Sequence, residues 1–395
     1  MKITLVGMGC GLAGLTGEGL TALRQADLIL GAGRLLEMLS GLPARKVAAV
    51  QNDAIVAALE AGGYQNACVA FSGDTGFYSG AARLLAALEE RGLSAKILPG
   101  VSSLQYFAAR LGRPWQDWLL VSAHGRPCDP VAQVMRGKPV FFLTGGRQGV
   151  AGLCRALTEA GLGGLEVTVG ENLSYPEETI TTTTAAALAE SGAAPLSVLL
   201  VEPAPRCPRR APGIPDEAFI RGKTPMTKQE VRAAILAKLA PGPEEICWDV
   251  GAGTGSVSVE LALCAGKVFA VEREKEACAL VRANREKFCA WNLCLAEGAA
   301  PAALEPLPTP DAVFVGGSGG ELPAILAAIR RKNPQARVCV SAIALETLHS
   351  AMEQLAAFGW AVEVSQISVS RAKGVGSLHL LMAQNPVFLI TGTPV

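Results

Sequence analysis

The chain has 395 residues and no formal net charge; half of its residues are hydrophobic and few are aromatic. This length fits two or three domains with sizeable cores. The neutral charge argues against nucleic acid or an anionic membrane as a partner. The eleven cysteines include no CxxC pair and no Cys/His cluster. We therefore expect no metal site and a reducing, cytoplasmic location, in agreement with a first strand that no signal peptide precedes.

The first hundred residues alternate between predicted strands and glycine-rich loops. The expected strands lie at 2–6, 26–31, 67–71 and 96–98, and the expected helices at 16–25 and 80–91. In a parallel sheet the loops that follow such strands meet at one edge, where ligands bind in open α/β folds. Asp27 stands at the start of its strand, the wrong end to bind a ribose, so a dinucleotide is disfavoured in this half.

A second α/β lobe follows residue 114, and a proline-rich linker follows the lobe. The lobe has expected strands at 118–122, 139–143, 166–170 and 196–201. Six prolines then fall between 202 and 225, a density that no regular helix or central strand tolerates. We place the linker at 206–225 and the domain boundary near 205–212.

The clearest motif of the chain follows a short apolar strand that ends in Asp249. Gly251, Gly253 and Gly255 stand at every second position after it, and Glu272 ends the next expected strand, 267–272. Glycines let a ligand approach the main-chain N–H groups of a helix N-terminus, and an acid at the second strand end suits the hydroxyls of a ribose. An acid before the first glycine favours a cationic amino-acid group over a pyrophosphate, so the motif favours S-adenosylmethionine (SAM) over NAD; a glycine turn without a ligand is the remaining alternative.

The rest of this half continues the doubly wound pattern. We expect strands at 292–295, 311–315, 337–341, 361–369 and 377–384, with a helix at 345–358. The residues after 295 are in the usual place for adenine contacts, and a Gly-Gly-Ser-Gly-Gly loop at 316–320 offers several N–H groups to a carboxylate. Thr227 and Glu230 have the spacing of a capping box at the start of a helix.

Five spaced motifs of the first half resemble the tetrapyrrole (precorrin/corrin) methyltransferases, and most closely the C5-methylating branch of cobalamin synthesis. They are Gly7-x-Gly9-x-Gly11 with Leu15-Thr16, Ser72-Gly73-Asp74 with Tyr78, Pro99-Gly100-Val101-Ser102-Ser103, Ser122-Ala123-His124-Gly125-Arg126, and Gly170-Glu171 with Tyr175-Pro176-Glu177-Glu178. Thr75 replaces the proline, and Thr179 the arginine, that the family usually has.

The resemblance implies a two-lobed α/β domain at 1–205, with lobes at about 1–113 and 114–205. In this family SAM lies between the lobes, where Cys10, Asp74, Phe77, Ser102 and Ser103 would line it. His124 and Arg126 would face the tetrapyrrole. From spacing alone, a helix N-cap is the simpler interpretation of Ser102 or Ser103, worth about 1 kcal/mol, and the His124 motif could equally be a solvated turn.

Residues 213–395 resemble the decarboxylating C15-methyltransferase of the same pathway, with a Rossmann-like fold. The matching segments are 214–219, 227–232, 249–255, Glu272, 311–320, 342–346 and 385–388. The resemblance implies cofactor contacts from Thr227, Asp249, Gly251, Ala252, Gly253, Thr254, Gly255, Glu272 and Ala300. It implies substrate contacts from Gly316, Gly317, Ser318 and Gly319. Ala299 replaces the family's usual acid.

Together, the two resemblances predict one bifunctional, SAM-dependent enzyme of cobalamin synthesis. It would methylate C5 and C15 of precorrin-6B or cobalt-precorrin-6B and decarboxylate the C12 acetate, with Arg371 or Lys373 as candidates to orient that acetate. We expect a homo-oligomer and single out no catalytic side chain, since methyl transfer needs alignment more than a strong base. The alternatives are a methyltransferase of RNA or protein, an NAD-dependent oxidoreductase, or a silent SAM-binding module.

Overall fold

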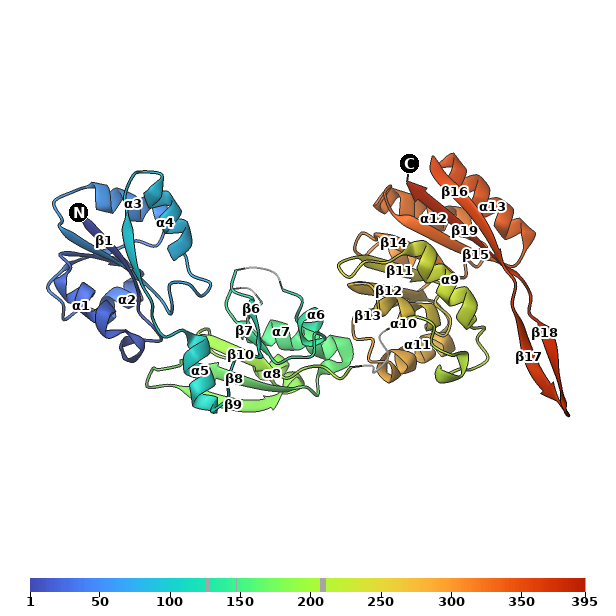
Figure 1. Ribbon diagram of the computed structural model, residues 1–395, viewed down its shortest axis with the longest axis horizontal. Coiled ribbons are helices and arrows are strands. Elements are labelled where there is room, and N and C mark those ends of the chain that lie inside the picture. Colours follow the sequence, from blue (N-terminus) through green and yellow to red (C-terminus); the bar gives the residue numbers. More distant parts are fainter. Residues whose placement is uncertain (126–127, 147, 207–210, 395) are drawn as a thin grey trace. The chain divides into compact units, whose positions relative to one another are not determined.

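The computed structural model describes residues 1–125, 128–146, 148–206 and 211–394 (Figure 1). Arg126, an expected substrate contact, therefore lies outside the described residues. The chain divides into two units. The first comprises Met1–Glu159 and Gly163–Pro203, and the second comprises Ala160–Leu162 and Ala204–Val395.

The first lobe of the first unit is a parallel sheet covered by helices on both faces. Its strands, in the order β3-β2-β4-β1-β5, are β1 (Lys2–Gly7), β2 (Leu28–Gly31), β3 (Arg45–Ala48), β4 (Asn66–Phe71) and β5 (Ala95–Leu98). Its helices are α1 (Gly17–Gln25), α2 (Gly33–Met38), α3 (Asn52–Glu60) and α4 (Ala81–Glu89). Alternate residues of β1 serve the two faces: Leu5 packs in the core of α3 and α4, and Val6 in the core of α1 and α2. The predicted parallel arrangement is confirmed.

The second lobe is a five-stranded mixed sheet in the order β6-β7-β10-β8-β9. Its elements are α5 (Ser103–Leu111), β6 (Leu119–Ser122), α6 (Pro130–Val134), β7 (Val140–Leu143), α7 (Gly149–Leu157), the π-helical turn Thr158–Leu162, β8 (Glu166–Glu171), β9 (Thr179–Thr184), α8 (Ala185–Ser191) and β10 (Ser197–Val201). The four predicted strands are present. The prediction missed β9 because this edge strand, Thr-Ile-Thr-Thr-Thr-Thr, has too few apolar residues to show a buried face.

The second unit is a seven-stranded sheet between two helical layers, in the order β13-β12-β11-β14-β15-β19-β16. Its strands are β11 (Ile246–Val250), β12 (Lys267–Glu272), β13 (Leu293–Glu297), β14 (Ala312–Val315), β15 (Arg337–Ala342), β16 (Trp360–Ile367) and β19 (Val387–Pro394). Helices α9 (Gln229–Leu239), α10 (Ser256–Ala262) and α11 (Lys275–Lys287) cover one face, and α12 (Leu322–Lys332) and α13 (Leu345–Ala357) cover the other. The predicted doubly wound arrangement is confirmed for the five parallel strands, β11 to β15.

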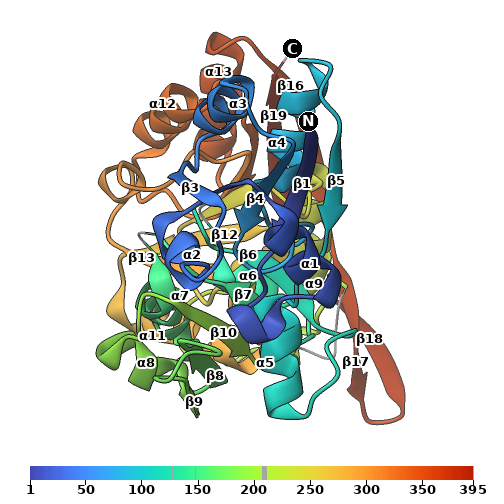
Figure 2. The ribbon, with the colours of Figure 1, turned by 90° about the vertical axis from the view of Figure 1, so that its left-hand side faces the viewer.

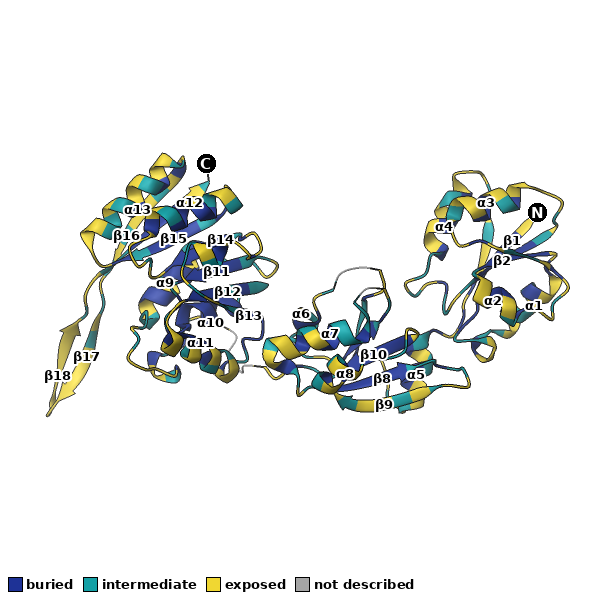
Figure 3. Ribbon diagram, turned by 180° about the vertical axis from the view of Figure 1, so that it is seen from behind, coloured by how far each residue is buried: buried dark blue, intermediate teal, exposed yellow. Residues whose placement is uncertain are grey.

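The expectation that residues 377–384 add a strand to this sheet is wrong. They form β18 (Leu378–Ala383), which pairs only with β17 (Ser370–Val375) in a separate two-stranded hairpin. The last strand of the sheet is β19, which runs antiparallel to both β15 and β16. The hairpin extends away from the rest of the second unit in both views (Figures 1 and 2) and is almost wholly exposed (Figure 3).

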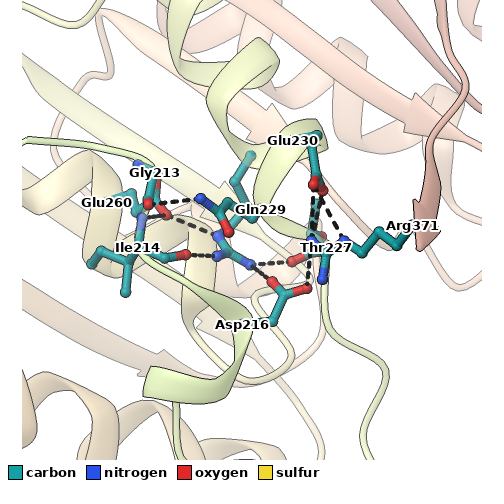
Figure 4. Close-up of polar contacts among 9 residues, drawn as sticks. Gly213, Ile214, Asp216, Thr227, Gln229, Glu230, Glu260 and Arg371 are labelled. Carbon is teal, nitrogen blue, oxygen red and sulfur yellow. Dashed lines mark hydrogen bonds and ion pairs between the residues drawn. The ribbon is translucent and has the colours of Figure 1, made fainter. Parts of the chain in front are cut away.

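The predicted capping box at Thr227 and Glu230 is also wrong. The N-cap of α9 is Lys228, and its side chain makes no capping hydrogen bond. Glu230 instead accepts two hydrogen bonds from Arg371 Nη2, at 2.8 and 3.0 Å (Figure 4). A charged guanidinium is a stronger partner for a carboxylate than a backbone N–H.

A fully buried arginine, Arg232, connects several polar groups of this region. Arg232 donates to Glu260 Oε1 at 2.9 Å and to Asp216 Oδ1 at 2.8 Å, and its guanidinium also contacts the carbonyls of Ile214 and Thr227. These contacts join the segment before α9 to α9 and α10. A buried charge is tolerated when it is paired and hydrogen-bonded in this way.

We predict that Arg232→Ala destabilises the second unit by about 3–5 kcal/mol, because it removes the buried cation that Asp216 and Glu260 share. Urea unfolding followed by tryptophan fluorescence measures this. Arg331→Ala is the matched control, since Arg331 pairs with Glu305 at the exposed surface, where a pair contributes up to about 1 kcal/mol. Equal effects of the two substitutions would contradict the importance of the buried cluster.

Candidate functional site

The glycine turn after β11 and the loop after β14 touch through backbone atoms. Gly251 has a φ of 74°, and a Cβ at this position would lie 2.4 Å from the Gly317 carbonyl oxygen. No residue other than glycine fits this contact without movement of a loop. The structure thus brings the predicted turn at 249–255 and the predicted 316–320 loop together at the carboxyl edge of the sheet.

Asp249 lies beneath this turn and is 1% exposed. One of its oxygens, Oδ2, accepts a hydrogen bond from the Ser258 hydroxyl. The other, Oδ1, and the Thr254 hydroxyl, which is also buried, have no partner among the described residues. Burial raises the pKa of Asp249 to about 7, and the nearby Glu272 adds to this effect. Such unsatisfied buried groups suit a ligand that donates hydrogen bonds or carries positive charge.

Glu272, at the end of β12, holds the glycine turn from the other side. Its carboxylate accepts hydrogen bonds from the backbone N–H of Gly253 at 2.8 Å, Arg273 at 2.8 Å and Glu274 at 2.9 Å. Glu272 and the predicted adenine contact Ala300 both line a cavity of about 340 Å³. The acid at the second strand end therefore has a structural partner in the turn as well as a place in a cavity.

A larger cavity, of about 860 Å³, lies over the glycine turn. The predicted site residues that line it are Thr227, Asp249, Gly251, Ala252, Gly253, Thr254, Gly316, Gly317 and Ser318. Four predicted residues are not part of its lining; two of them, Glu272 and Ala300, line the smaller cavity, as described above. Gly319 also lines the smaller cavity, and Gly255 is the N-cap of α10, where a Cβ would meet Val281 at 3.2 Å.

The structure does not place Arg371 or Lys373 in either cavity. Arg371 pairs with Glu230 and also lies 3.3 Å from Asp216 Oδ2, so its charge is already balanced. Lys373 lies on the exposed strand β17. The structure therefore gives no support to the hypothesis that either residue orients the acetate, and sequence spacing did not reveal the carboxylates that face Arg371.

Sequence reasoning missed Lys228, which lines the larger cavity. It also missed an apolar wall of this cavity, formed by residues of α9 and the segment before it and of the strands and loops beyond β15. The members of this wall are Met226, Val231, Ile343, Ile367, Val369 and Val387. The signal for Lys228 was its place directly after Thr227; the wall gave no signal, because its members are distant in sequence.

In the first unit, the three predicted loops also meet through their backbones. A Cβ on Gly7 would lie 2.6 Å from the Gly100 nitrogen. Asp74 joins the loops, because its two oxygens accept hydrogen bonds from the N–H of Gly76 at 2.8 Å and of Gly100 at 3.2 Å. Thr75, at the usual proline position, is buried and donates to the Leu98 carbonyl at 3.3 Å. The loop that carries Asp74 is therefore held at several points.

The other predicted cofactor contacts of this unit lie near these loops. Ser102 is the N-cap of α5 and forms a capping box with Gln105, and Ser103 is the first residue of that helix. The Phe77 ring packs 6.2 Å from that of Phe141, between ring centroids. Cys10 is half-buried, and burial raises the pKa of its thiol to about 11. Ser102 therefore has the structural role that spacing favoured.

Sequence reasoning quoted Glu178 but gave it no role. Burial alone would raise its pKa, yet hydrogen bonds from the Ser174 N–H at 2.6 Å, Arg110 Nε at 2.7 Å and the Tyr106 hydroxyl at 2.9 Å hold the pKa below its usual value. The Ser174 hydroxyl is buried without a partner among the described residues, and a Cβ on Gly11 would lie 3.0 Å from it. Glu178 thus fixes a loop beside the glycine loop of β1.

On the expected tetrapyrrole side of the first unit, His124 is exposed. Its Nδ1 lies 3.4 Å from the Thr144 carbonyl oxygen. Across the described ranges, no group of three or more His, Cys, Asp or Glu side chains could hold a metal ion. Within the same ranges, no helix is long and apolar enough to cross a bilayer.

Comparison with known proteins assigns each half of the chain to a protein family. Residues 2–189 match the Tetrapyrrole (Corrin/Porphyrin) Methylases family, and residues 217–393 match the Precorrin methyltransferase domain family. A precorrin-6Y C(5,15)-methyltransferase [decarboxylating] from Sinorhizobium sp is 33% identical over 389 residues, 95% of this chain and 92% of the relative. A probable cobalt-precorrin-6B C(15)-methyltransferase (decarboxylating) from Pyrobaculum calidifontis is 44% identical over 189 residues, 47% of this chain and 97% of the relative.

Among solved structures, a precorrin-6Y C5,15-methyltransferase from Geobacter metallireducens GS-15 is 39% identical, with a TM-score of 0.45, over 47% of this chain and 97% of that one. The two family matches place two domains of methyltransferase families in one chain. The whole-chain similarity to the Sinorhizobium protein then fixes the assignment: the chain belongs to the decarboxylating precorrin-6Y C(5,15)-methyltransferase family.

We predict that Gly251→Ala lowers the unfolding free energy of the second unit by about 1–3 kcal/mol, because the new methyl group overlaps the Gly317 carbonyl and the backbone φ is positive. Thermal unfolding measures this loss. Gly374→Ala is the control, since no atom lies within 4 Å of its Cβ position and its φ is not in the positive range. A Gly251→Ala protein as stable as the control would contradict the contact.

Proposed function

We propose that this chain uses SAM to methylate C5 and C15 of precorrin-6B, or of its cobalt form, and to remove the C12 acetate carboxylate as carbon dioxide. The observation that carries the proposal is the similarity to a decarboxylating C(5,15)-methyltransferase over 95% of the chain, through both units. C5 methylation is assigned to the first unit and the other two reactions to the second. The separate matches of the two halves support this division.

The residues of the second unit fit SAM. Asp249 Oδ1 and the Thr254 hydroxyl are buried and unsatisfied, as a cationic amino-acid group requires of its partners. Glu272 and Ala300 share the smaller cavity, which suits a ribose and an adenine. The glycine turn presents its backbone to the larger cavity. When bound, SAM supplies an electrophilic methyl group on a sulfonium.

In the first unit, the fit to SAM depends on backbone groups more than on side chains. The carboxylate of Asp74 and the hydroxyl of Ser102 are already engaged within the protein. We propose that they shape the cofactor site between the lobes, and that Cys10, Phe77 and Ser103 line it. The unsatisfied Ser174 hydroxyl, near Gly11, is a further donor for that site.

The chain's own residues contribute mainly orientation and exclusion of water. Holding the acceptor carbon in line with the methyl group can account for roughly 7–11 kcal/mol of the barrier. The apolar wall of the larger cavity removes water from the acceptor and from the carboxylate that leaves. The electron pair left by carbon dioxide can pass into the conjugated imines of the tetrapyrrole. The reaction therefore needs no Schiff-base lysine.

Mass spectrometry after incubation with SAM and precorrin-6B tests the proposal. We expect two added methyl groups and the loss of one carbon dioxide. Gly253→Arg places a long side chain at the turn over the larger cavity, and should abolish decarboxylation and C15 methylation while C5 methylation of a decarboxylated substrate continues. Loss of every activity in a variant with wild-type circular dichroism would contradict the division between units, and an unmodified precorrin with the wild-type protein would refute the function.

The pKa of Asp249 predicts a pH dependence of cofactor affinity. An ordinary carboxyl group has a pKa well below 7, but burial raises the pKa of Asp249 to about 7. Below that value the folded protein holds a neutral carboxyl, which attracts a cation poorly. The affinity of the second unit for SAM should therefore rise up to about tenfold per pH unit as pH increases to 7, and level off above it.

Isothermal titration calorimetry with SAM between pH 5.5 and 8.5 measures this dependence. The Asp249→Asn variant should lose the pH-dependent component of binding, since its amide does not titrate. A pH dependence that persists unchanged in Asp249→Asn would show that another group is responsible.

A further inference from the structure

The charges that line the larger cavity are few. Of the described residues around it, Asp249 and Lys228 are charged, and all the others are neutral. Asp249 lies at the buried floor, under the glycine turn. Lys228 comes from the start of α9 and is half-buried. The cavity therefore has one anionic and one cationic side chain, from different elements.

The ammonium group of Lys228 makes no hydrogen bond or ion pair with the described residues. Its backbone position is nevertheless well defined. The preceding carbonyl, of Thr227, accepts a hydrogen bond from Arg232, and the Lys228 carbonyl accepts the N–H of the same residue at 2.8 Å. The buried cluster around Arg232 thus holds the base of this lysine, and the side chain stays available to a ligand.

The two guanidinium groups near this region are already paired, and Arg232 is balanced by Asp216 and Glu260. Arg371 is balanced by Glu230 and Asp216 (Figure 4). The first turn of α9 also lacks a side-chain cap, so its N–H groups reinforce the positive charge at Lys228. An anion that enters the cavity is therefore attracted to Lys228 and the start of α9.

We infer that Lys228 anchors a carboxylate side chain of the tetrapyrrole substrate in the second unit. This inference rests on the function proposed above. Precorrins carry several acetate and propionate groups at the ring edge, so a single cation in a largely apolar cavity can fix the rotation of the ring. The anchored carboxylate is one that stays on the ring, because an ammonium paired with the leaving carboxylate would stabilise it and slow the loss of carbon dioxide. Lys228 is thus a positioning residue.

Absorbance titration of the protein with precorrin-6B, in the presence of S-adenosylhomocysteine, tests this anchor without turnover. We expect Lys228→Gln to weaken tetrapyrrole binding to the second unit by about tenfold or more, as for the loss of a hydrogen bond between charged groups. Lys228→Arg should restore most of the affinity. Lys223→Gln is the matched control, since Lys223 is exposed in the same segment and lies outside the cavity.

Two further measurements separate the anchor from other roles. In steady-state decarboxylation, the KM for precorrin should rise in Lys228→Gln while kcat changes by less than about threefold. The Kd for SAM should stay within about twofold of wild type; a change in SAM affinity with unaltered tetrapyrrole binding would overturn the inference and assign Lys228 to the cofactor. Unaltered tetrapyrrole binding in Lys228→Gln also overturns it, whereas a wild-type protein that binds no precorrin would overturn the proposed function as well.

Discussion

In both units, loops at the carboxyl ends of parallel strands touch through backbone atoms where two glycines face each other. Gly251 meets Gly317 in the second unit, and Gly7 meets Gly100 in the first. A methyl group on Gly7, Gly100 or Gly251 would come within 2.6 Å of backbone atoms on the facing loop, whereas one on Gly317 would lie 3.9 Å from Gly251. This constraint keeps side chains out of the loop edge, so a ligand there can reach main-chain N–H groups directly. The same solution appears on two different folds.

The second unit adds a buried charge cluster that supports its cavity from behind. Arg232, Asp216 and Glu260 join the segment before α9 to α10, and Arg371 continues the cluster to the hairpin. Such clusters contribute little net stability compared with apolar packing, but removing one member is costly. Here the cluster fixes the chain between Thr224 and Lys228, which forms one wall of the cavity. Buried charge therefore defines the shape of the site more than its chemistry.

The sequence alone predicts those structural features that depend on short-range patterns of residues. Apolar runs identified the parallel strands except β3, whose residues are partly exposed, and the interval from Asp249 to Glu272 placed both acids near one edge of the sheet. The antiparallel insertion of β19 between β15 and β16 was not predictable in this way, since it depends on a pairing that skips the hairpin. The threonines of β9 likewise carry no hydrophobic alternation.

The sequence-based predictions for Glu230 and Arg371 failed for one reason. Each residue has an interaction partner that is distant in sequence. Glu230 matches the local pattern of a capping box, but Arg371, 141 residues away, takes its carboxylate. The same pair engages Arg371 outside the larger cavity, where Lys228 is the cation among the described lining residues. Propensity and spacing describe neighbours along the chain, and a strong long-range ion pair overrides them.

The central claim is that one polypeptide holds two separate cofactor sites, one in each unit. The stoichiometry of S-adenosylhomocysteine binding, from calorimetry on the intact chain at pH 8, tests it most directly. We predict two molecules bound per chain, falling to one in Asp249→Asn. A wild-type stoichiometry of one or none, or two sites lost together in that variant, would contradict it.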